Sequence, residues 1–411
     1  MKKLLLLSFL GLAQISAAQI TIDVLSYNVL NFPNGSASRI DTLKKILTHY
    51  TPDLMLVQEL KSDVGLASIT TALNEISPDP YSSGTYEVQQ SNPSSSWKLQ
   101  QNIIYNTDMF SLAEEKVITS TYRDINYFKL YLNDVNLSTS LDTIFLHVYV
   151  THLKSSQGAT NEQLRFEMSQ VMRAEINALP ANSNVLCGGD FNVYNSSEAA
   201  YQHLLTTGLT NTLVDPINLP GDWHDGAFPN KEIHTQSTRL TALSDGASGG
   251  LDDRFDFVLH STELNQGNSR LDYIDGTYDA LGNNGTCYNQ DLLNCTSIGN
   301  VPDSIISALY YFSDHLPVVF SLSSDATLSA AVQALNDFQI YPNPVENLLY
   351  LITNSNQPIR LIITDISGKV VVDTTFTNKY AYDLTSINPG IYLVNLLDGN
   401  VLVKREKVFK L

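Results

Sequence analysis

Residues 184–192 read NVLCGGDFN, an apolar run that ends in two glycines, an acid and an amide. The run favours a β-strand over Asn184–Gly188, and side chains two positions apart in an extended chain can face the same side. Asp190 and Asn192 are therefore expected to point together just beyond the strand. This is the sharpest cluster of chemically useful side chains in the sequence.

Outward from this stretch, short β-rich runs alternate with polar loops and a few helical stretches between about residues 20 and 323. Strands are predicted over Thr21–Val29, Leu54–Glu59, Asn102–Tyr105, Thr143–Thr151, Asn184–Gly188, Arg254–Leu259 and Val318–Leu322, and helices over Arg39–Tyr50 and Gln163–Ala178. In the helices the apolar residues recur at a spacing of three and four. The pattern predicts a layered α/β or α+β domain, with surface loops over 220–251 and 275–302.

Other strand ends carry polar residues in the same way. Asn28 ends LSYN, Glu59 ends LMLVQE, His152 ends FLHVYVTH, Asp256 lies inside RFDFVL, and Asp314-His315 precedes a strand. Alone, each residue is more often a turn, a solvated strand end or a satisfied core histidine. Together they are the parts that hydrolysis of a phosphate ester needs: oxygen ligands for a divalent metal, an imidazole, and a carboxylate beside it.

The charge of the chain limits its partners. There are 24 Lys and Arg against 42 Asp and Glu, a net charge of −18. Seven acids and seven bases cancel in residues 337–411, so residues 19–335 hold 35 acids against only 15 bases. This excludes a protein that coats nucleic acid by counterion release, but not transient capture of one phosphodiester at a metal.

The N-terminus is typical of a secretory signal peptide. Lys2-Lys3 precede the apolar stretch Leu4–Leu12 and the small residues Ser16–Ala18, which predicts a signal peptide over residues 1–18. No later segment is long and apolar enough to predict a membrane span. Export would let Cys287 and Cys295 close a small disulfide, although their spacing alone leaves free thiols equally open. Cys187 lies in an apolar strand pattern and is read as a buried thiol.

The end of the chain has a different texture. Residues 324–337 are mostly small and predict a linker, and residues 338–411 hold short β-rich runs with turns and no helix pattern. The pattern predicts a small β-sandwich.

In that order, LSYNVLN, LVQEL, THLKS, GGDFN, RFDFVL and SDHLPV resemble the motifs of the endonuclease/exonuclease/phosphatase family, which has the DNase I-like fold. The resemblance covers residues 19–323 and implies a four-layered α/β sandwich, two packed β-sheets flanked by helices. It also implies a metal-dependent hydrolase of phosphate esters that uses Mg²⁺, with Mn²⁺ or Ca²⁺ as alternatives.

The resemblance assigns roles position by position. Glu59 is implied to be the principal metal ligand, with Asn28 beside it and Asp314 completing the metal-side acids. His315, oriented by Asp256, is implied to be the base for water or the electrostatic partner of the phosphate. Asn192 and His152 would hold phosphate oxygens, and Asp190 would orient the nucleophile or assist the leaving group. Lys154 and Arg254 are further candidates for positive charge near the phosphate, with surface solvation as the alternative for each.

The sequence departs from the family at one position. Pancreatic-type nucleases supply a Glu before the strand at 102–105 to pair with the histidine matching His152, whereas this chain reads Lys98-Leu99-Gln100-Gln101. Without an acid partner, His152 would bind phosphate rather than donate a proton.

The C-terminal region resembles the sorting domain of cargo for the type IX (Por) secretion system. The resemblance rests on YPNP, ITDISGKVV and the closing KVFK, and it implies passage across the outer membrane by that machinery after signal-peptide export. A small adhesion or carbohydrate-binding sandwich is the alternative, but this region contains no Trp.

Together these features predict a secreted phosphoesterase, with an extracellular endonuclease acting on nucleic acid as the leading hypothesis. A phosphodiesterase or phosphatase for lipid head groups (sphingomyelinase-like) or small phosphate esters is the alternative within the enzyme class. A non-catalytic surface binding protein is the alternative outside it, although it would need none of Glu59, Asp190, Asn192, Asp256 and His315.

Overall fold

The structure of the protein is a computed structural model with two compact units, residues 1–327 and 328–411. It describes residues 20–34, 38–77, 79–134, 143–224, 226–243, 245–265, 270–295, 301–326, 328, 338–353, 358–365, 369–398 and 401–411. The predicted signal peptide, and the predicted linker apart from residues 324–326 and 328, lie outside the described residues.

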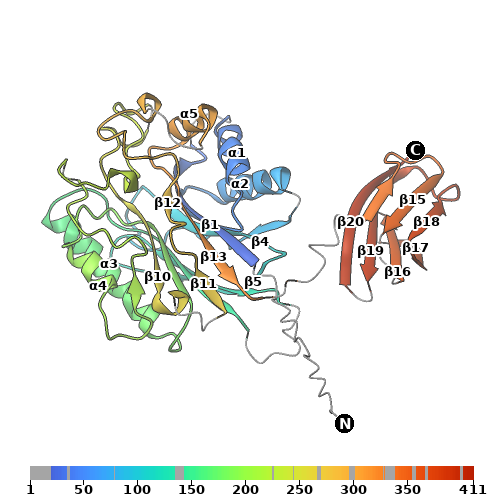
Figure 1. Ribbon diagram of the computed structural model, residues 1–411, viewed down its shortest axis with the longest axis horizontal. Coiled ribbons are helices and arrows are strands. Elements are labelled where there is room, and N and C mark those ends of the chain that lie inside the picture. Colours follow the sequence, from blue (N-terminus) through green and yellow to red (C-terminus); the bar gives the residue numbers. More distant parts are fainter. Residues whose placement is uncertain are drawn as a thin grey trace, which may run out of the picture. The chain divides into compact units, whose positions relative to one another are not determined.

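The first unit is built on two β-sheets (Figure 1). One has the strand order β11-β13-β1-β2-β4-β3, with β12 paired to β13, and the other has the order β5-β6-β7-β8-β10-β9. The first sheet contains β1 (Ile20–Phe32), β2 (Leu54–Leu60), β3 (Tyr81–Ser83), β4 (Gln100–Asn106), β11 (Leu271–Tyr273), β12 (Asp279–Ala280) and β13 (Val318–Ser324). The second contains β5 (Phe110–Ile118), β6 (Ile125–Leu132), β7 (Phe145–His152), β8 (Val185–Asp190), β9 (Leu213–Val214) and β10 (Asp256–Ser261).

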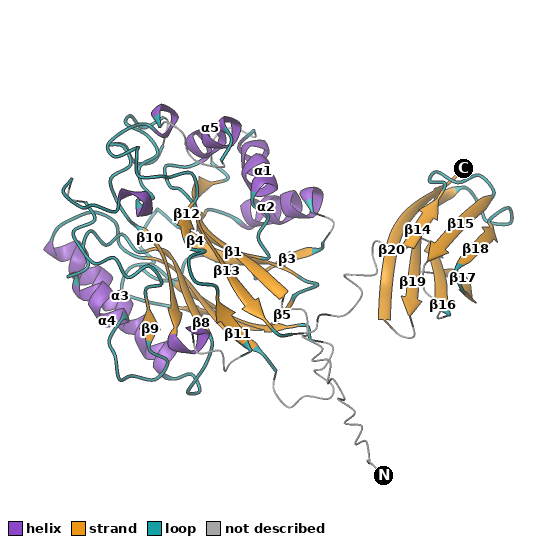
Figure 2. Cartoon of the chain, in the orientation of Figure 1, coloured by secondary structure: helices purple, strands orange, loops and turns teal. Residues whose placement is uncertain are grey.

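The sheets pack face to face and helices cover their outer faces, as Figure 2 shows. The apolar core between the sheets includes Leu56 of β2, Val148 of β7 and Leu186 of β8. A second core joins the outer face of the first sheet to α1 (Arg39–His49), α2 (Asp63–Ile76) and α5 (Asp303–Phe312). A third joins the other outer face to α3 (Ala159–Asn177) and α4 (Ala199–Leu204). The result is the four-layered α/β sandwich that the sequence motifs imply.

The two glycines of NVLCGGDFN are required by this packing. A Cβ on Gly188 would lie 2.5 Å from Leu56 Cδ2 in the facing sheet. A Cβ on Gly189 would lie 1.9 Å from the carbonyl oxygen of Thr151, and its φ of +142° also disfavours other residues. These positions let β8 approach both its neighbour β7 and the opposite sheet.

The second unit is a two-sheet β structure. One sheet has the order β14-β15-β18 and the other β17-β16-β19-β20. Its strands are β14 (Phe338–Tyr341), β15 (Leu348–Thr353), β16 (Ile359–Asp365), β17 (Val370–Phe376), β18 (Lys379–Asp383), β19 (Gly390–Asp398) and β20 (Val401–Lys410). Side chains such as Leu349, Leu361, Val394 and Leu396 fill the core of this unit.

The sequence predicted the central strands and two helices but missed several elements. Helices α2 and α5 and the hairpin β5–β6 were not predicted. The surface-loop prediction for residues 220–251 is wrong for part of that segment, because Thr235, Ser237, Thr238 and Arg239 are buried. Cys287 and Cys295 are joined as a disulfide with Cα atoms 5.2 Å apart, and Cys187 is a buried free thiol. Within the described residues, no helix combines the length and apolarity that a membrane crossing requires.

Candidate active site

Strand direction gathers the predicted residues at one end of the sandwich. Strands β1 and β2 run parallel, as do β7 and β8, so Asn28, Glu59, His152 and Asp190 all lie at or near carboxyl ends. The register pairs His152 with Asp190 across β7 and β8. Antiparallel β10 begins at this same end, where Asp256 pairs with Asp190. Residues chosen from distant parts of the sequence therefore meet because the strands align.

Antiparallel β13 completes this end of the first sheet. It pairs with β1, and Asp314 and His315 precede its first residue. The Ser313 hydroxyl donates a hydrogen bond of 2.7 Å to the carbonyl oxygen of Asn28, which ties this turn to β1.

Asn28 links the two sheets through its side-chain amide. Its Nδ2 donates to Glu59 Oε1 at 3.1 Å and to Asp190 Oδ2 at 3.1 Å, while its Oδ1 accepts from the Leu30 N–H at 3.0 Å. One side chain thus binds both Glu59 of the first sheet and Asp190 of the second sheet.

His315 forms a buried pair with Asp256. Its Nδ1 lies 2.7 Å from Asp256 Oδ2, which leaves Nε2 facing Asp190 Oδ2 at 3.7 Å. Burial lowers the pKa of His315, but the carboxylates of Asp256, Asp190 and Asp314 outweigh burial and raise it well above the ordinary value. These carboxylates therefore favour protonation of His315, and its Nε2 faces the site next to Asn28 Nδ2 at 3.4 Å and the side-chain amide of Gln236.

His152 has a different environment. Its Nε2 lies 3.3 Å from Asp190 Oδ2, whereas its Nδ1 is buried without a hydrogen-bond partner in the described part of the chain and lies 4.0 Å from Glu59 Oε1. Burial, followed by the positive charge of Arg123, lowers the pKa of His152 well below its ordinary value. His152 is thus a neutral imidazole, suited to hydrogen bonding rather than to carrying charge.

Gln100 and Gln101 precede the predicted strand at 102–105, where an acid to pair with His152 would be expected from the family resemblance. Both side chains bond to Asp124: Gln100 Nε2 donates to its carboxylate at 3.1 Å, and Gln101 Nε2 donates to its backbone carbonyl at 2.9 Å. The carboxylate nearest to His152 is instead that of Asp190.

Asp190 is the centre of the cluster. Three nitrogen atoms surround its Oδ2, from Asn28, His152 and His315, and its Oδ1 accepts the Asn192 N–H at 3.1 Å. Burial raises the pKa of Asp190 to about 7, even though nearby His315 lowers it. A carboxyl group with this pKa can take up or release a proton near neutral pH.

The donor set fits a divalent cation. Asp314 Oδ1 and Asp256 Oδ1 are buried without hydrogen-bond partners among the described residues. One ligand atom each from Glu59, His152 and Asp190 lies within 4.8 Å of the others. Burial, then the charge of Asp314, raises the pKa of Glu59, while His315 and Arg123 lower it. Hard oxygen donors are the preferred ligands of Mg²⁺, Mn²⁺ and Ca²⁺.

The backbone is strained at the same residues. Glu59, Asn192 and Asn31 have φ values of +64°, +52° and +50°, a region that costs energy for residues other than glycine. The Asn31 N–H donates to Glu59 Oε2 at 2.9 Å, so one strained residue holds the carboxylate of another. Asn192, by contrast, directs its amide to the Leu153 carbonyl at 3.4 Å.

Gln236 is a site residue that sequence reasoning missed. Gln236 forms isolated bridges with Asp253, three residues before β10, and with His315, three residues before β13, so its segment connects the two sheets at this end. The Gln236 Nε2 contacts His315 Nε2 and lies 3.3 Å from Asp314 Oδ2. No local motif marks this residue, because it reaches the site from an irregular segment.

The two predicted phosphate-binding cations lie differently. Arg254 is buried, and both of its Nη atoms pair with Asp215 at 2.7 and 2.9 Å, so it is held away from the cluster. Lys154 is half-buried, donates to the Ser155 carbonyl at 2.6 Å, and lies close enough for its charge to lower the pKa of His152.

Comparison with known proteins gives two matches to protein families. Residues 25–315 match the model described as endonuclease/exonuclease/phosphatase family, and residues 339–410 match the model described as secretion system C-terminal sorting domain. No curated protein matches the chain.

Several solved structures are similar at low sequence identity. An endonuclease/exonuclease/phosphatase family protein from Bacteroides thetaiotaomicron is 15% identical over 75% of this chain and 99% of its own, with a TM-score of 0.46. TDP2 from D. rerio, complexed with a single-strand DNA product, is 16% identical over 74% and 98%, with a TM-score of 0.46. The human Nocturnin catalytic domain, with a bound sulfate anion, is 15% identical over 75% and 97%, with a TM-score of 0.43.

Proposed function

Because the chain belongs to the endonuclease/exonuclease/phosphatase family, we propose that it is a secreted, metal-dependent phosphodiesterase that acts as an extracellular endonuclease. The observation that carries the proposal is the buried His315–Asp256 pair, which faces Asp190 at the edge of the acid cluster. A non-catalytic binding protein would gain nothing from this arrangement, since each buried charge costs folding energy.

We assign the metal to the acids on the β1–β2 side of the cluster. Glu59 would hold the cation, with Asn28 and Asp314 beside it, and Mg²⁺ is the expected ion, with Mn²⁺ or Ca²⁺ as alternatives. When bound, the cation supplies positive charge against the phosphate oxygens.

The other site residues would have different roles, which follow from the environment of each side chain. His315, kept protonated by its carboxylate neighbours, would hold a non-bridging phosphate oxygen through Nε2 and stabilise the charge that develops there. Asp190, with a pKa near 7, would orient the attacking water and accept its proton. Neutral His152 and Asn192 would bind the other phosphate oxygens, and Asp256 keeps His315 in position.

An exposed aromatic side chain favours nucleic acid over other phosphate esters. Trp97 is 58% exposed, and the ammonium group of Lys61 lies 4.6 Å from the centre of its ring. Lys61 follows the proposed metal ligand Glu59 by two residues in the chain, so this pair is a candidate to contact a substrate held there. Flat aromatic faces next to a cation stack nucleobases without sequence preference.

The two ends of the chain support secretion. The C-terminal unit is a secretion system sorting domain, and we propose that residues 1–18 are removed as a signal peptide before residues 338–411 engage the type IX machinery. On this proposal the catalytic domain, residues 19–323, works outside the cell or at its surface.

One assay tests the function. The purified protein is offered plasmid DNA, RNA, sphingomyelin and bis(p-nitrophenyl) phosphate, each with Mg²⁺, Mn²⁺, Ca²⁺ or EDTA. We expect cleavage of nucleic acid with metal and none with EDTA. The matched variants are His315→Ala and His49→Ala, because His49 is an exposed histidine at the end of α1.

The possible results separate the alternatives. Cleavage of sphingomyelin but not of nucleic acid would replace the nuclease with a lipid phosphodiesterase. Equal activity with EDTA and with Mg²⁺, or equal activity of His315→Ala and the wild type, would contradict a metal-dependent hydrolase.

A further inference from the structure

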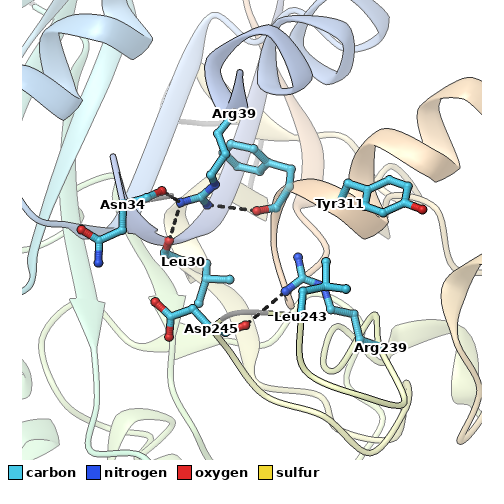
Figure 3. Close-up of a pocket in the computed structure, with 8 residues that line it drawn as sticks. Leu30, Asn34, Arg39, Arg239, Leu243, Asp245 and Tyr311 are labelled. Carbon is cyan, nitrogen blue, oxygen red and sulfur yellow. Dashed lines mark hydrogen bonds between the residues drawn. The ribbon is translucent and has the colours of Figure 1, made fainter. Parts of the chain in front are cut away.

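A cavity of about 280 Å³ lies next to the end of β1, two residues beyond Asn28, where Leu30 is one of its lining residues; Figure 3 shows the side chains that line it. It is lined by Leu30, Asn34, Arg39, Arg239, Leu243, Asp245, Tyr311 and Phe312. None of these residues belongs to the predicted catalytic or metal-binding set, so the cavity is a separate feature of the same end of the sandwich.

The walls of the cavity are continuous with the metal-side acids. The Leu30 N–H donates to Asn28 Oδ1 at 3.0 Å, which places this wall directly behind Asn28. Asp245 also lines the cavity, and two residues later the Ala247 N–H donates to Asp314 Oδ2 at 2.6 Å. A group bound in the cavity would therefore sit next to a phosphate held at the acid cluster.

Arg39 is fixed at the cavity without a carboxylate partner. Its Nη1 donates to the carbonyl oxygens of Leu30 at 3.0 Å and Asn34 at 2.7 Å. Its Nη2 donates to those of Val29 at 2.7 Å and Phe312 at 2.9 Å. These four bonds use all four Nη hydrogens and hold the guanidinium rigidly, so Arg39 offers the cavity its positive charge rather than a free Nη donor.

Arg239 approaches the same cavity from the other side (Figure 3). It is 2% exposed, and it donates to the carbonyl oxygens of Tyr310 at 2.9 Å and Asp245 at 3.3 Å. The Asp245 carboxylate accepts instead from Asn31 Nδ2 at 2.9 Å. Within the described residues, neither Arg239 nor Arg39 makes a salt bridge.

Two guanidinium groups and one carboxylate, that of Asp245, line the cavity, which leaves it a net positive charge. Burial lowers the pKa of both arginines and the charge of Arg239 also lowers that of Arg39, whereas Asp245 and Asp314 raise the pKa of both. An anion entering the cavity would offset this repulsion, and guanidinium groups favour phosphate.

The mouth of the cavity is apolar. Leu243 is 50% exposed and Tyr311 is 55% exposed, a high exposure for two large apolar side chains that line one cavity. An aromatic ring and a leucine suit a flat, weakly polar group such as a nucleobase. The volume is near the lower limit for ligand pockets, which matches one nucleotide unit rather than a double helix.

We propose that this cavity binds the nucleotide unit next to the scissile phosphate, with the neighbouring phosphate bound by Arg239 beside the charge of Arg39 and the base on Tyr311 and Leu243. The inference rests on the proposed function. It adds that the enzyme prefers substrates that carry a second phosphate. The enzyme should therefore cleave flexible polynucleotide chains more efficiently than isolated phosphodiesters.

Chromogenic substrates that differ by one phosphate test this inference. The first pair is the p-nitrophenyl ester of thymidine 5′-phosphate with and without a 3′-phosphate. The second is the corresponding 3′-ester with and without a 5′-phosphate, so that either chain direction is covered. We expect the second phosphate to lower KM in one pair by about 10- to 100-fold, the usual range for hydrogen bonds to charged groups.

The variants tie the preference to the cavity. Arg239→Gln should reduce the KM ratio of that pair to below about 3-fold, and Arg239→Lys should restore part of it, because a point charge remains. Tyr311→Ala should raise KM for both members of the pair equally. The control is Lys116→Gln, which removes an exposed cation paired with Glu175 and should keep the wild-type ratio.

Three results would overturn the inference. A wild-type ratio of about 1 in both pairs would remove it while leaving the nuclease proposal intact, and so would an unchanged ratio in Arg239→Gln. If none of the esters or nucleic acids is cleaved, the proposed function falls and the cavity's role falls with it. Thermal melting checks that Arg239→Gln is folded; if it is not, the wild-type ratio and Tyr311→Ala decide.

Discussion

The two units of the chain are both built from paired β-sheets, yet they bury different side chains. At one end of its sandwich the first unit buries the acids Asp190, Asp256 and Asp314 together with His152 and His315. Among the described residues of the second unit, Thr353 is the one buried polar residue. Buried charge is expensive unless it is paired, so the first unit retains it for chemistry. The second unit has the interior expected of a module that only has to fold and be recognised.

The largest contrast concerns glycine. Gly189→Ala would drive a Cβ into the Thr151 carbonyl 1.9 Å away, which should break the β7–β8 pairing and prevent the first unit from folding. Gly390→Ala in β19 would meet only Tyr392 at 3.6 Å or more, so it should change the melting temperature little. Soluble yield and circular dichroism of the two variants measure this difference. A folded, active Gly189→Ala protein would show that the strands are less tightly held than their geometry indicates.

The next contrast separates activity from stability. His315→Ala should reduce kcat/KM on DNA by about 10³-fold or more, or roughly 4 kcal/mol of transition-state stabilisation, because it removes the charged group facing the phosphate. Asp190→Asn should have a loss of similar size. Asp190→Asn should not lower the melting temperature by more than a few degrees, since it relieves part of the charge crowding. His315→Ala leaves the buried Asp256 carboxylate unpaired and should lower the melting temperature further. A loss of activity in Asp190→Asn that is matched by unfolding would instead make this residue structural.

Most of the site was predictable because its residues stand at strand ends within recognisable motifs. The strand register then brings these residues together. Because β8 lies between β7 and β10, both His152 and Asp256 pair with Asp190. Gln236 could not be predicted, because its position depends on bridges between an irregular segment and two distant strands. For the same reason, the sequence around Arg254 did not indicate that this residue would pair with Asp215, 39 residues away.

The fold shows a similar division. Strands with continuous apolar runs were predictable, whereas β5 was not, since Glu114, Glu115 and Lys116 interrupt its pattern on the exposed face. Helix α5 begins directly after Pro302 and is mostly apolar, so its sequence resembles a buried strand as much as a helix. In both cases tertiary contacts decide between structures that the local sequence leaves open.

Metal binding should affect the two units unequally. If a divalent ion binds the folded cluster and not the unfolded chain, Mg²⁺ at 100 times its Kd should stabilise the first unit by about 2.7 kcal/mol. Differential scanning calorimetry should then show one transition moving to higher temperature with Mg²⁺ and the transition of the second unit staying in place. Asp314→Asn should reduce the shift, because it removes a carboxylate whose Oδ1 is buried without a partner among the described residues. Equal shifts of both transitions would indicate a general salt effect.

The smallest expected effect is on the surface of the second unit. Arg360 and Asp373 form a two-pronged ion pair across β16 and β17, with Nε to Oδ1 at 2.8 Å and Nη2 to Oδ2 at 2.6 Å. Both side chains are exposed, at 45% and 44%, so solvent and salt screen their attraction. Arg360→Gln should therefore leave the melting transition of this unit within experimental error and its salt dependence nearly flat. A clear loss of stability that disappears in high salt would show that the second unit, like the first, depends on charge for its structure.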